Sequence, residues 1–192
     1  MTSSKIDVAV TSSSGIGILL GNGDGTFQPV TFPIGSSASV FFAADVNGDG
    51  KLDLVGLNGL SLQVWLGNGD GTFKTLAPIT SAFGAVAAVA DLNGDGHLDI
   101  LVNSGNGPRG GGVLHLLLGN GDGTFGSPIT IILTAAGPFS FVTIGDFNND
   151  GREDIAVSLG ALATTVLEPI GGVFTLLNVT PADFSISSAP PP

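Results

Sequence analysis

Three nine-residue segments with the same pattern of side-chain oxygens recur along this chain, at residues 45–53, 91–99 and 146–154. Each has Asp at positions 1, 5 and 9, Asn at position 3 and Gly at position 6. Calcium takes about six to eight oxygen ligands, and a glycine at position 6 permits the sharp turn that lets a short loop surround the ion. A simple Asp- and Gly-rich turn would not need the same oxygens at four positions in three copies. The pattern therefore predicts three calcium loops.

The closing acid distinguishes these segments from calcium loops that join two helices, which need a carboxylate at position 12. Position 12 here is Gly56, Val102 or Val157, and the closing acid stands at position 9. The residues after position 9 are mostly aliphatic and often β-branched, which is typical of strands. Each loop is therefore expected to join two strands.

A second motif, Leu-Gly-Asn-Gly-Asp-Gly-Thr-Phe, stays in step with the first and occupies residues 20–27, 66–73 and 118–125. Its glycines and asparagine tolerate a left-handed backbone, and apolar runs flank it, so it predicts a hairpin turn between strands. A phosphate-binding loop is not favoured, because the Lys and the following helix of such a loop are missing. The copies are 46 and then 52 residues apart, a period that indicates an array of supersecondary units.

Each unit accommodates four short strands, named a to d in chain order. In the second unit we expect strand a near residues 39–44, strand b at 52–57, strand c at 62–66 and strand d at about 73–79. Four strands in roughly 45 residues form one blade of a β-propeller. Strands b and c are apolar on both faces, as expected of blades packed between neighbouring blades. We therefore expect an all-β propeller of about four blades, either a closed four-bladed ring or part of a larger or multi-chain assembly.

The paired motifs resemble the FG-GAP and VCBS-type calcium repeats of integrin α-subunit propellers and of many bacterial secreted proteins. The resemblance covers about residues 5–174. It implies an extracellular propeller that holds one calcium ion in each a–b loop, with an adhesive or lectin-like role. It implies side-chain ligands at positions 1, 3, 5 and 9 and a backbone carbonyl ligand at position 7. These residues are Asp45, Asn47, Asp49, Lys51 and Asp53; Asp91, Asn93, Asp95, His97 and Asp99; and Asp146, Asn148, Asp150, Arg152 and Asp154.

The two ends of the chain are expected to be incomplete blades. Asp7 lies 13 residues before Leu20, the interval that position 9 keeps in the second unit, so the first blade should lack strand a. Asp154 and Leu167 are also 13 residues apart, and residues 168–174 are expected to replace the usual turn.

We assign residues 1–180 to the repeats and residues 181–192 to a closing strand and a Pro-rich tail. Pairing of residues 182–188 into the first blade would close a four-bladed ring. The likeness to integrins instead implies a larger ring, whose open edges another copy would cover.

The balance of charge restricts the partners. Sixteen Asp and Glu face five Lys and Arg, and the resulting net charge of -11 argues against nucleic acid or an anionic membrane surface as partner. The sequence has no long apolar span, so membrane insertion is not expected. Cysteine is absent, so no disulfide supports the fold. Millimolar calcium outside cells would fill weak sites that the cytosol leaves empty, which favours an extracellular or cell-surface location. Residues 1–5 hold no signal peptide, so we expect the chain to begin at a mature or constructed terminus.

Little in the sequence indicates an enzyme. His97 lies in a metal loop and His115 on a strand c, and neither has a nucleophile or an acid at the spacing of a triad. We therefore expect a non-catalytic recognition module that binds a protein or a glycan. The alternative is a structural subunit that assembles into oligomers or fibres through its incomplete terminal blades.

Two insertions in the third unit indicate where a ligand would bind. Six extra residues lie within 103–112, between strands b and c, and three more lie near residues 134–139, between strand d and the next strand a. Both connections are expected on the side opposite the metal loops, and insertions in repeat arrays often mark the binding face. We expect a ligand or a neighbouring subunit to contact Asn106, Arg109 and Phe139.

Overall fold

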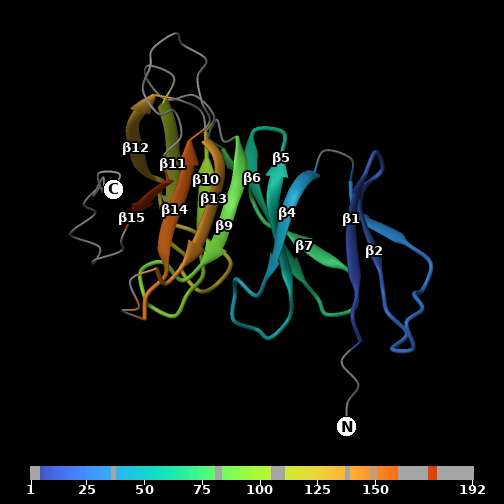
Figure 1. The fold of residues 1–192 in the computed structure, drawn as a ribbon. Coiled ribbons are helices and arrows are strands. Elements are labelled where there is room, and N and C mark those ends of the chain that lie inside the picture. The colour runs from blue at the N-terminus through green and yellow to red at the C-terminus, as the bar shows by residue number, and fades with distance from the viewer. Residues whose placement is uncertain are drawn as a thin grey trace. The chain divides into compact units, whose positions relative to one another are not determined.

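The computed structural model describes residues 5–35, 38–80, 84–104, 111–136, 139–147, 149, 151–159 and 173–176. Within these residues all regular structure is β-strand, and every strand pairs antiparallel with its neighbour. The chain divides into two compact units, Met1–Ala82 and Phe83–Pro192, and each unit contains two sheets (Figure 1). The expectation of an all-β fold is therefore confirmed.

The first unit contains a three-stranded and a larger sheet. The three-stranded sheet consists of β1 (Val8–Ser12), β2 (Gly15–Leu19) and β3 (Thr31–Ile34). The larger sheet runs in chain order through β4 (Ala38–Ala44), β5 (Asp53–Asn58), β6 (Ser61–Gly67) and β7 (Phe73–Thr75), and β8 (Ile79–Thr80) also pairs with β6.

The second unit repeats this arrangement. Its four-stranded sheet consists of β9 (Ala85–Ala90), β10 (Asp99–Asn103), β11 (Gly111–Leu117) and β12 (Ile129–Ala136). Its three-stranded sheet consists of β13 (Phe139–Gly145), β14 (Asp154–Leu159) and β15 (Val173–Leu176). In all four sheets consecutive strands are neighbours, as the repeat predicts, except that β8 pairs with β6 and not with β7.

The strands of the second sheet agree with the expected positions of strands a to c to within about a residue, but strand d is interrupted. The expected strand at 73–79 is divided into β7 and β8, and Pro78 lies between them. Proline has no amide hydrogen to donate, so it is found on edge strands and limits their pairing. The Gln63 side chain bridges the interruption, because its Nε2 donates to the Leu76 carbonyl at 2.6 Å.

Among the described residues the first sheet consists of three strands, and β1 follows Asp7 directly, as strand b follows position 9 in the other units. At the other end β15 pairs directly with β14, with Phe174 opposite Val157, and so takes the place of strand c. The interpretation of residues 168–174 as a turn is therefore wrong, because Val173 and Phe174 lie in a strand. Leu167 lies outside the described residues. The predicted closing strand at 182–188 lies outside the described residues.

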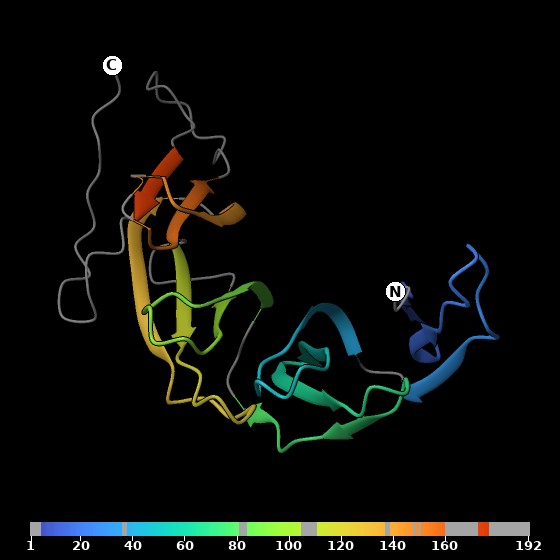
Figure 2. The same cartoon turned by 90° about the horizontal axis from the view of Figure 1, so that it is seen from below.

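The two sheets of each unit pack face to face, as the view from below shows (Figure 2). In the first unit Ile16, Ile18 and Ile34 of the first sheet pack against Leu54 and Trp65 of the second. In the second unit the β9–β12 sheet packs against Ile155 and Val157 of β14. Each fully buried aliphatic side chain contributes roughly 1.5–3 kcal/mol, so these clusters hold the sheets together.

Candidate metal loops and their clamp

The first two Asp-rich loops connect β4 to β5 and β9 to β10, the a–b positions that the sequence predicts. In the first loop both Asp45 Oδ1 and Asn47 Oδ1 accept the Asp49 amide, at 3.1 and 3.0 Å, and Asp45 Oδ2 accepts the Gly50 amide at 2.8 Å. Asp49 Oδ1 in turn accepts the Lys51 amide at 2.9 Å. Side-chain oxygens at positions 1, 3 and 5 thus converge on the backbone of their own loop.

The second loop repeats these contacts, and the third shares those that fall on described residues. Asp91 Oδ2 accepts the Gly96 amide and Asp146 Oδ2 accepts the Gly151 amide, both at 2.8 Å. At position 4 the first two loops have glycine with positive φ, whereas the third has Asn149 at a φ of 60°. Asn is one of the few residues besides glycine that adopt this conformation readily. Asn148 and Asp150 lie outside the described residues.

The acid at position 9 has a role that the sequence did not indicate. Asp53 is fully buried, its Oδ2 accepts the Val46 amide at 3.0 Å, and its Oδ1 accepts the Gly67 amide at 2.8 Å. Asp99 is equally buried and accepts the Leu92 and Gly119 amides, both at 2.9 Å. Each carboxylate therefore joins the start of the a–b loop to the end of strand c. We refer to these contacts as the Asp clamp.

The Asp clamp extends to the incomplete blades. Asp7 Oδ1 accepts the Gly21 amide at 2.8 Å, which confirms that Asp7 is equivalent to position 9 of a metal loop. Asp154 is fully buried, and its Oδ2 accepts the Phe147 amide at 3.0 Å. The clamp explains why the two sequence motifs stay in step, since an acid in one bonds to a glycine in the other.

The glycine whose amide donates to the clamping carboxylate has no room for a side chain. A β-carbon on Gly67 would collide with the Leu52 carbonyl, and one on Gly119 would collide with the Leu98 carbonyl. Gly21 has the same relation to the Ile6 carbonyl. The Leu-Gly pair that opens the second motif is therefore required by close backbone approach at the end of strand c.

Burial opposes ionisation of the clamp. Desolvation raises the pKa of Asp53 and of Asp99, although the two amide hydrogen bonds on each carboxylate act to lower it. The other acids of each loop raise it further by repulsion. Removal of an amide partner would thus leave a buried carboxylate without compensation.

The c–d turns are held by a second set of contacts, which is the same in all three copies. In the first copy the Asp24 carboxylate accepts both the Thr26 amide at 2.9 Å and the Thr26 hydroxyl at 2.6 Å, and Asn22 Nδ2 donates to Thr26 Oγ1 at 2.8 Å. The threonine hydroxyl, followed by its amide, lowers the pKa of Asp24, and equivalent bonds lower the pKa of Asp70 and Asp122. The prediction of tight hairpin turns is confirmed.

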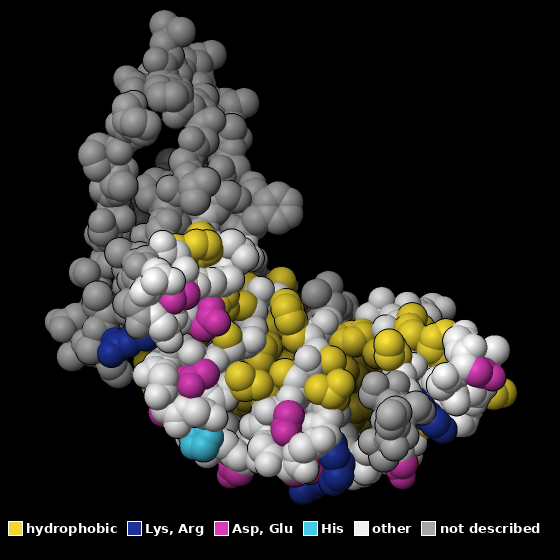
Figure 3. Space-filling view, turned by 60° about the horizontal axis from the view of Figure 1, so that its bottom comes forward, with side chains coloured by type: hydrophobic (Ala, Val, Ile, Leu, Met, Phe, Trp, Pro, Cys, Tyr) yellow, Lys and Arg dark blue, Asp and Glu magenta, His cyan; other side chains and the backbone are white. Residues whose placement is uncertain are grey.

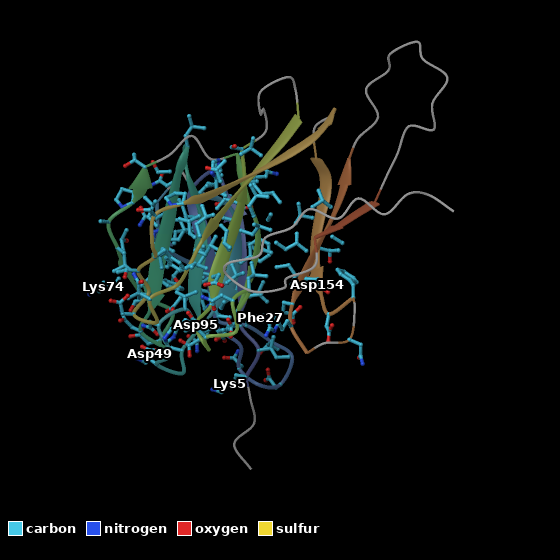
Figure 4. All side chains as sticks on the ribbon, turned by 90° about the vertical axis from the view of Figure 1, so that its left-hand side faces the viewer. Lys5, Phe27, Asp49, Lys74, Asp95 and Asp154 are labelled. Atoms are coloured by element: carbon cyan, nitrogen blue, oxygen red, sulfur yellow. The ribbon has the colours of Figure 1, made fainter. Side chains whose placement is uncertain are left out.

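Loops and turns lie at the same end of the strands within each unit. The labelled Phe27 and Asp49 of the first unit and Asp95 and Asp154 of the second lie at this end (Figure 4). Acidic side chains are visible at the loop end of each unit in the space-filling view (Figure 3).

The side chains at position 7 face water, as predicted for a position that would offer only its carbonyl. Lys51, His97 and Arg152 are all exposed. Lys51 Nζ lies 3.1 Å from Asp49 Oδ2, but such an exposed ion pair contributes little to stability.

The donor chemistry of the loops fits calcium, while their arrangement here serves hydrogen bonding. The side-chain donors at positions 1, 3, 5 and 9 are oxygens, and a carboxylate oxygen that accepts one amide retains a lone pair. Among the described residues, however, no three carboxylates or imidazoles are gathered closely enough to enclose an ion. Calcium ligation by these residues therefore stays a prediction.

The predicted ligand face is largely beyond the described residues. Asn106 and Arg109 lie outside them, and Phe139 is the first residue of β13. Beside the insertion lies a polar group that sequence reasoning missed: His115 Nε2 is 3.0 Å from Ser104 Oγ, and His115 Nδ1 is 3.3 Å from Thr130 Oγ1. Burial lowers the pKa of His115. These side chains meet because of the pairing register of β11 with its neighbouring strands, and this register could not be predicted from the sequence.

Repeated four-stranded meanders with an Asp-rich a–b loop and a Gly-rich c–d turn define a class of tandem-repeat β proteins. A family model, described as FG-GAP-like repeat, matches residues 4–56, 45–102 and 91–157. The chain therefore belongs to the FG-GAP-like repeat family. A search of curated proteins gives no match. No helix among the described residues is long and apolar enough to cross a membrane.

A solved lectin structure is similar to this chain. It is described as the structural basis of specific recognition of non-reducing terminal N-acetylglucosamine by an Agrocybe aegerita lectin. The two are 26% identical in sequence, with a TM-score of 0.61, and the match covers 93% of this chain. The chain spans about half the length of the lectin chain, of which 47% is covered.

Proposed function

We propose that this protein is a non-catalytic carbohydrate-recognition module that acts outside the cell. The observation that carries the proposal is the likeness to the N-acetylglucosamine-binding lectin, which extends over 93% of this chain. Terminal N-acetylglucosamine is accordingly the first sugar to test. The net charge of -11 supports an uncharged glycan over an anionic polymer as the ligand.

The architecture we propose is a β-propeller with the described sheets as its blades. Support comes from the antiparallel order of the strands, which follows the chain in every sheet except at β8, and from the face-to-face packing of sheets within each unit. Propellers present a broad face of connecting loops, and such loops commonly carry binding residues.

Calcium is proposed as a stabilising ion of the a–b loops. The ligands would be the side-chain oxygens at positions 1, 3 and 5, the backbone carbonyl at position 7 and the buried carboxylate at position 9. In the second loop these residues are Asp91, Asn93, Asp95, His97 and Asp99. The ion would neutralise carboxylates that otherwise repel one another, and it would supply no reaction chemistry. Filling of such weak sites by millimolar extracellular calcium supports the proposed location.

The sugar site is proposed on the side that carries the insertion between β10 and β11. Asn106, Arg109 and Phe139 are the proposed contacts, and His115 lies on β11, the strand that follows the insertion. Hydroxyl, amide and imidazole groups suit a neutral sugar, because each offers directional hydrogen bonds.

Glycan-array binding followed by calorimetry with an N-acetylglucosamine-terminated oligosaccharide tests the proposal. Replacement of residues 103–112 by the short hairpin of residues 58–61 should abolish binding and leave calcium-dependent melting unchanged. His97→Ala serves as the matched control and should bind normally. Absence of binding to every array glycan would refute the carbohydrate function, and unchanged binding by the loop replacement would refute the site.

A further inference from the structure

One Asn–Gly pair lies in a hairpin turn that belongs to neither of the repeated motifs. The register of β5 with β6 pairs Asn58 with Ser61, so Gly59 and Leu60 form the turn, and Gly59 has a φ of 66°. Asn58, Gly59 and Leu60 are all exposed. A β-carbon on Gly59 would meet no atom within 4 Å, so the space beside this glycine is open.

An asparagine followed by glycine can react with its own backbone. The glycine nitrogen attacks the Asn Cγ, and no side chain obstructs the approach. A bond forms between this nitrogen and Cγ, the bond from Cγ to Nδ2 breaks, and the proton of the glycine amide is taken up as ammonia leaves. Water then opens the cyclic imide at either carbonyl, which gives an aspartate or an isoaspartate. The chain contains seven Asn–Gly pairs, and the structure describes both residues of six of them.

The three c–d turns restrain their Asn–Gly pairs. Each asparagine donates from Nδ2 to the Oγ1 of the threonine four residues later, at 2.8, 2.8 and 2.9 Å for Asn22, Asn68 and Asn120. In the second turn the stem of Lys51 also covers Gly69, since a β-carbon there would lie 3.1 Å from Lys51 Cδ. Rotation of these side chains toward the glycine nitrogen would break a hydrogen bond.

The first two metal loops restrain theirs as well. Asn47 Oδ1 accepts the Asp49 amide at 3.0 Å. Asn93 Nδ2 donates to Asp95 Oδ2 at 2.8 Å, and the amide of the glycine after Asn93 already donates to Asp91 Oδ1 at 2.7 Å. Each hydrogen bond that must break first lowers the reactive population about two- to tenfold.

We propose that Asn58 is a modification site, at which the folded protein converts to an aspartate or an isoaspartate faster than at the other five described pairs. Within the described part of the chain no hydrogen bond holds the Asn58 side chain or the Gly59 amide. The reaction needs only water and adds a negative charge at the end of β5 that lies away from its metal loop. An isoaspartate also lengthens the main chain, so the pairing of Asn58 with Ser61 is the contact that it disturbs.

Peptide mapping by mass spectrometry after storage in a mildly alkaline, calcium-free buffer tests the proposal. In the folded chain, checked by circular dichroism, Asn58 should convert about two- to tenfold faster than Asn47 or Asn68. In guanidinium, where the fold no longer restrains any pair, the three should convert at similar rates. Conversion of Asn58 in the folded chain at or below the rate of Asn47 or Asn68 would overturn the proposal.

Two variants separate the reaction from the restraint. Asn58→Gln keeps the amide on a longer side chain, which must close a larger ring, and it should stop conversion at this position. Thr72→Val removes the acceptor of Asn68 Nδ2 and should speed conversion of Asn68 in the folded chain about two- to tenfold. Thr75→Val on β7 is the matched control and should leave Asn68 protected. An equal rate at Asn68 in Thr72→Val and Thr75→Val would contradict protection by the hydrogen bond.

Discussion

At the scale of single residues the main result is the double use of the acid at position 9. The sequence marks it as a ligand, whereas the structure shows both of its oxygens bonded to amides of two different connections. A carboxylate suits this task because it accepts from two donors at once in a fully buried place. The acid therefore contributes to the fold even where no ion is bound.

The Asp clamp predicts that Asp99→Asn destabilises the protein by roughly 1–3 kcal/mol, because an amide group would set one N–H against a backbone N–H. Guanidinium denaturation in the presence of a calcium chelator measures this loss without the contribution of the ion. Asp95→Asn, at an exposed position of the same loop, should lose much less stability than Asp99→Asn under these conditions. Equal losses in the two variants would show that the clamp is not a stabilising contact.

Residue chemistry was the part of the site that the sequence predicted best. Oxygen side chains at fixed positions, a glycine at each sharp turn and an exposed position 7 were all legible in the motifs. The clamp was not, since it joins residues 14 apart in one copy and 20 apart in another. The sequence indicated the clamp only through the constant interval between Asp7 or Asp53 and the next Leu-Gly pair. That interval was interpreted as the spacing of the repeat.

At the scale of elements the repeat places most strands correctly and fails at their irregular edges. Strands a to c of the second sheet were predicted to within about a residue because hydrophobic runs and turn motifs both delimit them. The length of strand d was overestimated, because a proline on an edge strand interrupts the pairing while the chain continues in an extended direction. Residues 168–174 were expected to form a turn, whereas Val173 and Phe174 pair with β14, because spacing along the sequence does not identify pairing partners.

The c–d turns predict a specific response to acid. Their aspartates have folded-state pKa values below the ordinary 3.8, so they stabilise the fold above that pH, and this contribution is lost as the pH falls through the lowered values. Replacing the turn threonines in Thr26→Val, Thr72→Val and Thr124→Val together should lower the melting temperature at neutral pH and flatten its fall in acid.

Melting curves from about pH 6 to about pH 2 check this response. Thr75→Val on β7 is the control, because its hydroxyl lies outside the turn motif. The raised pKa values of Asp53 and Asp99 act in the opposite direction, but they are common to all the variants. An acid limb as steep in the triple variant as in the wild type would contradict the role of the hydroxyl.

At the scale of the whole molecule the Asp-rich loops bring like charges together along one end of each unit. Nine of the sixteen acids occupy positions 1, 5 and 9 of the three loops. Repulsion among them is offset here by loop amides and, in the proposed loaded state, by calcium. Any ligand that binds only the folded chain stabilises it by mass action.

Chelation should therefore lower the melting temperature, and excess calcium should restore it. At a free concentration one hundred times the dissociation constant each site adds about 2.7 kcal/mol. Asp95→Ala should reduce the calcium-dependent shift, whereas His97→Ala should leave it intact, because only the former removes a side-chain oxygen. Melting that is indifferent to both chelator and calcium would contradict metal binding.

The Asp clamp also separates what can vary in this protein from what cannot. Asp99 still bonds to Gly119 although 20 residues separate these two, against 14 between Asp53 and Gly67 in the second sheet. Closing a longer loop adds little entropy cost, about 0.6 kcal/mol for each doubling of its length. The length of the connection between β10 and β11 therefore does not disturb the paired strands or the Asp clamp. Foreign peptides grafted into this connection should leave the fold unchanged. New binding specificities would then arise by exchange of one loop.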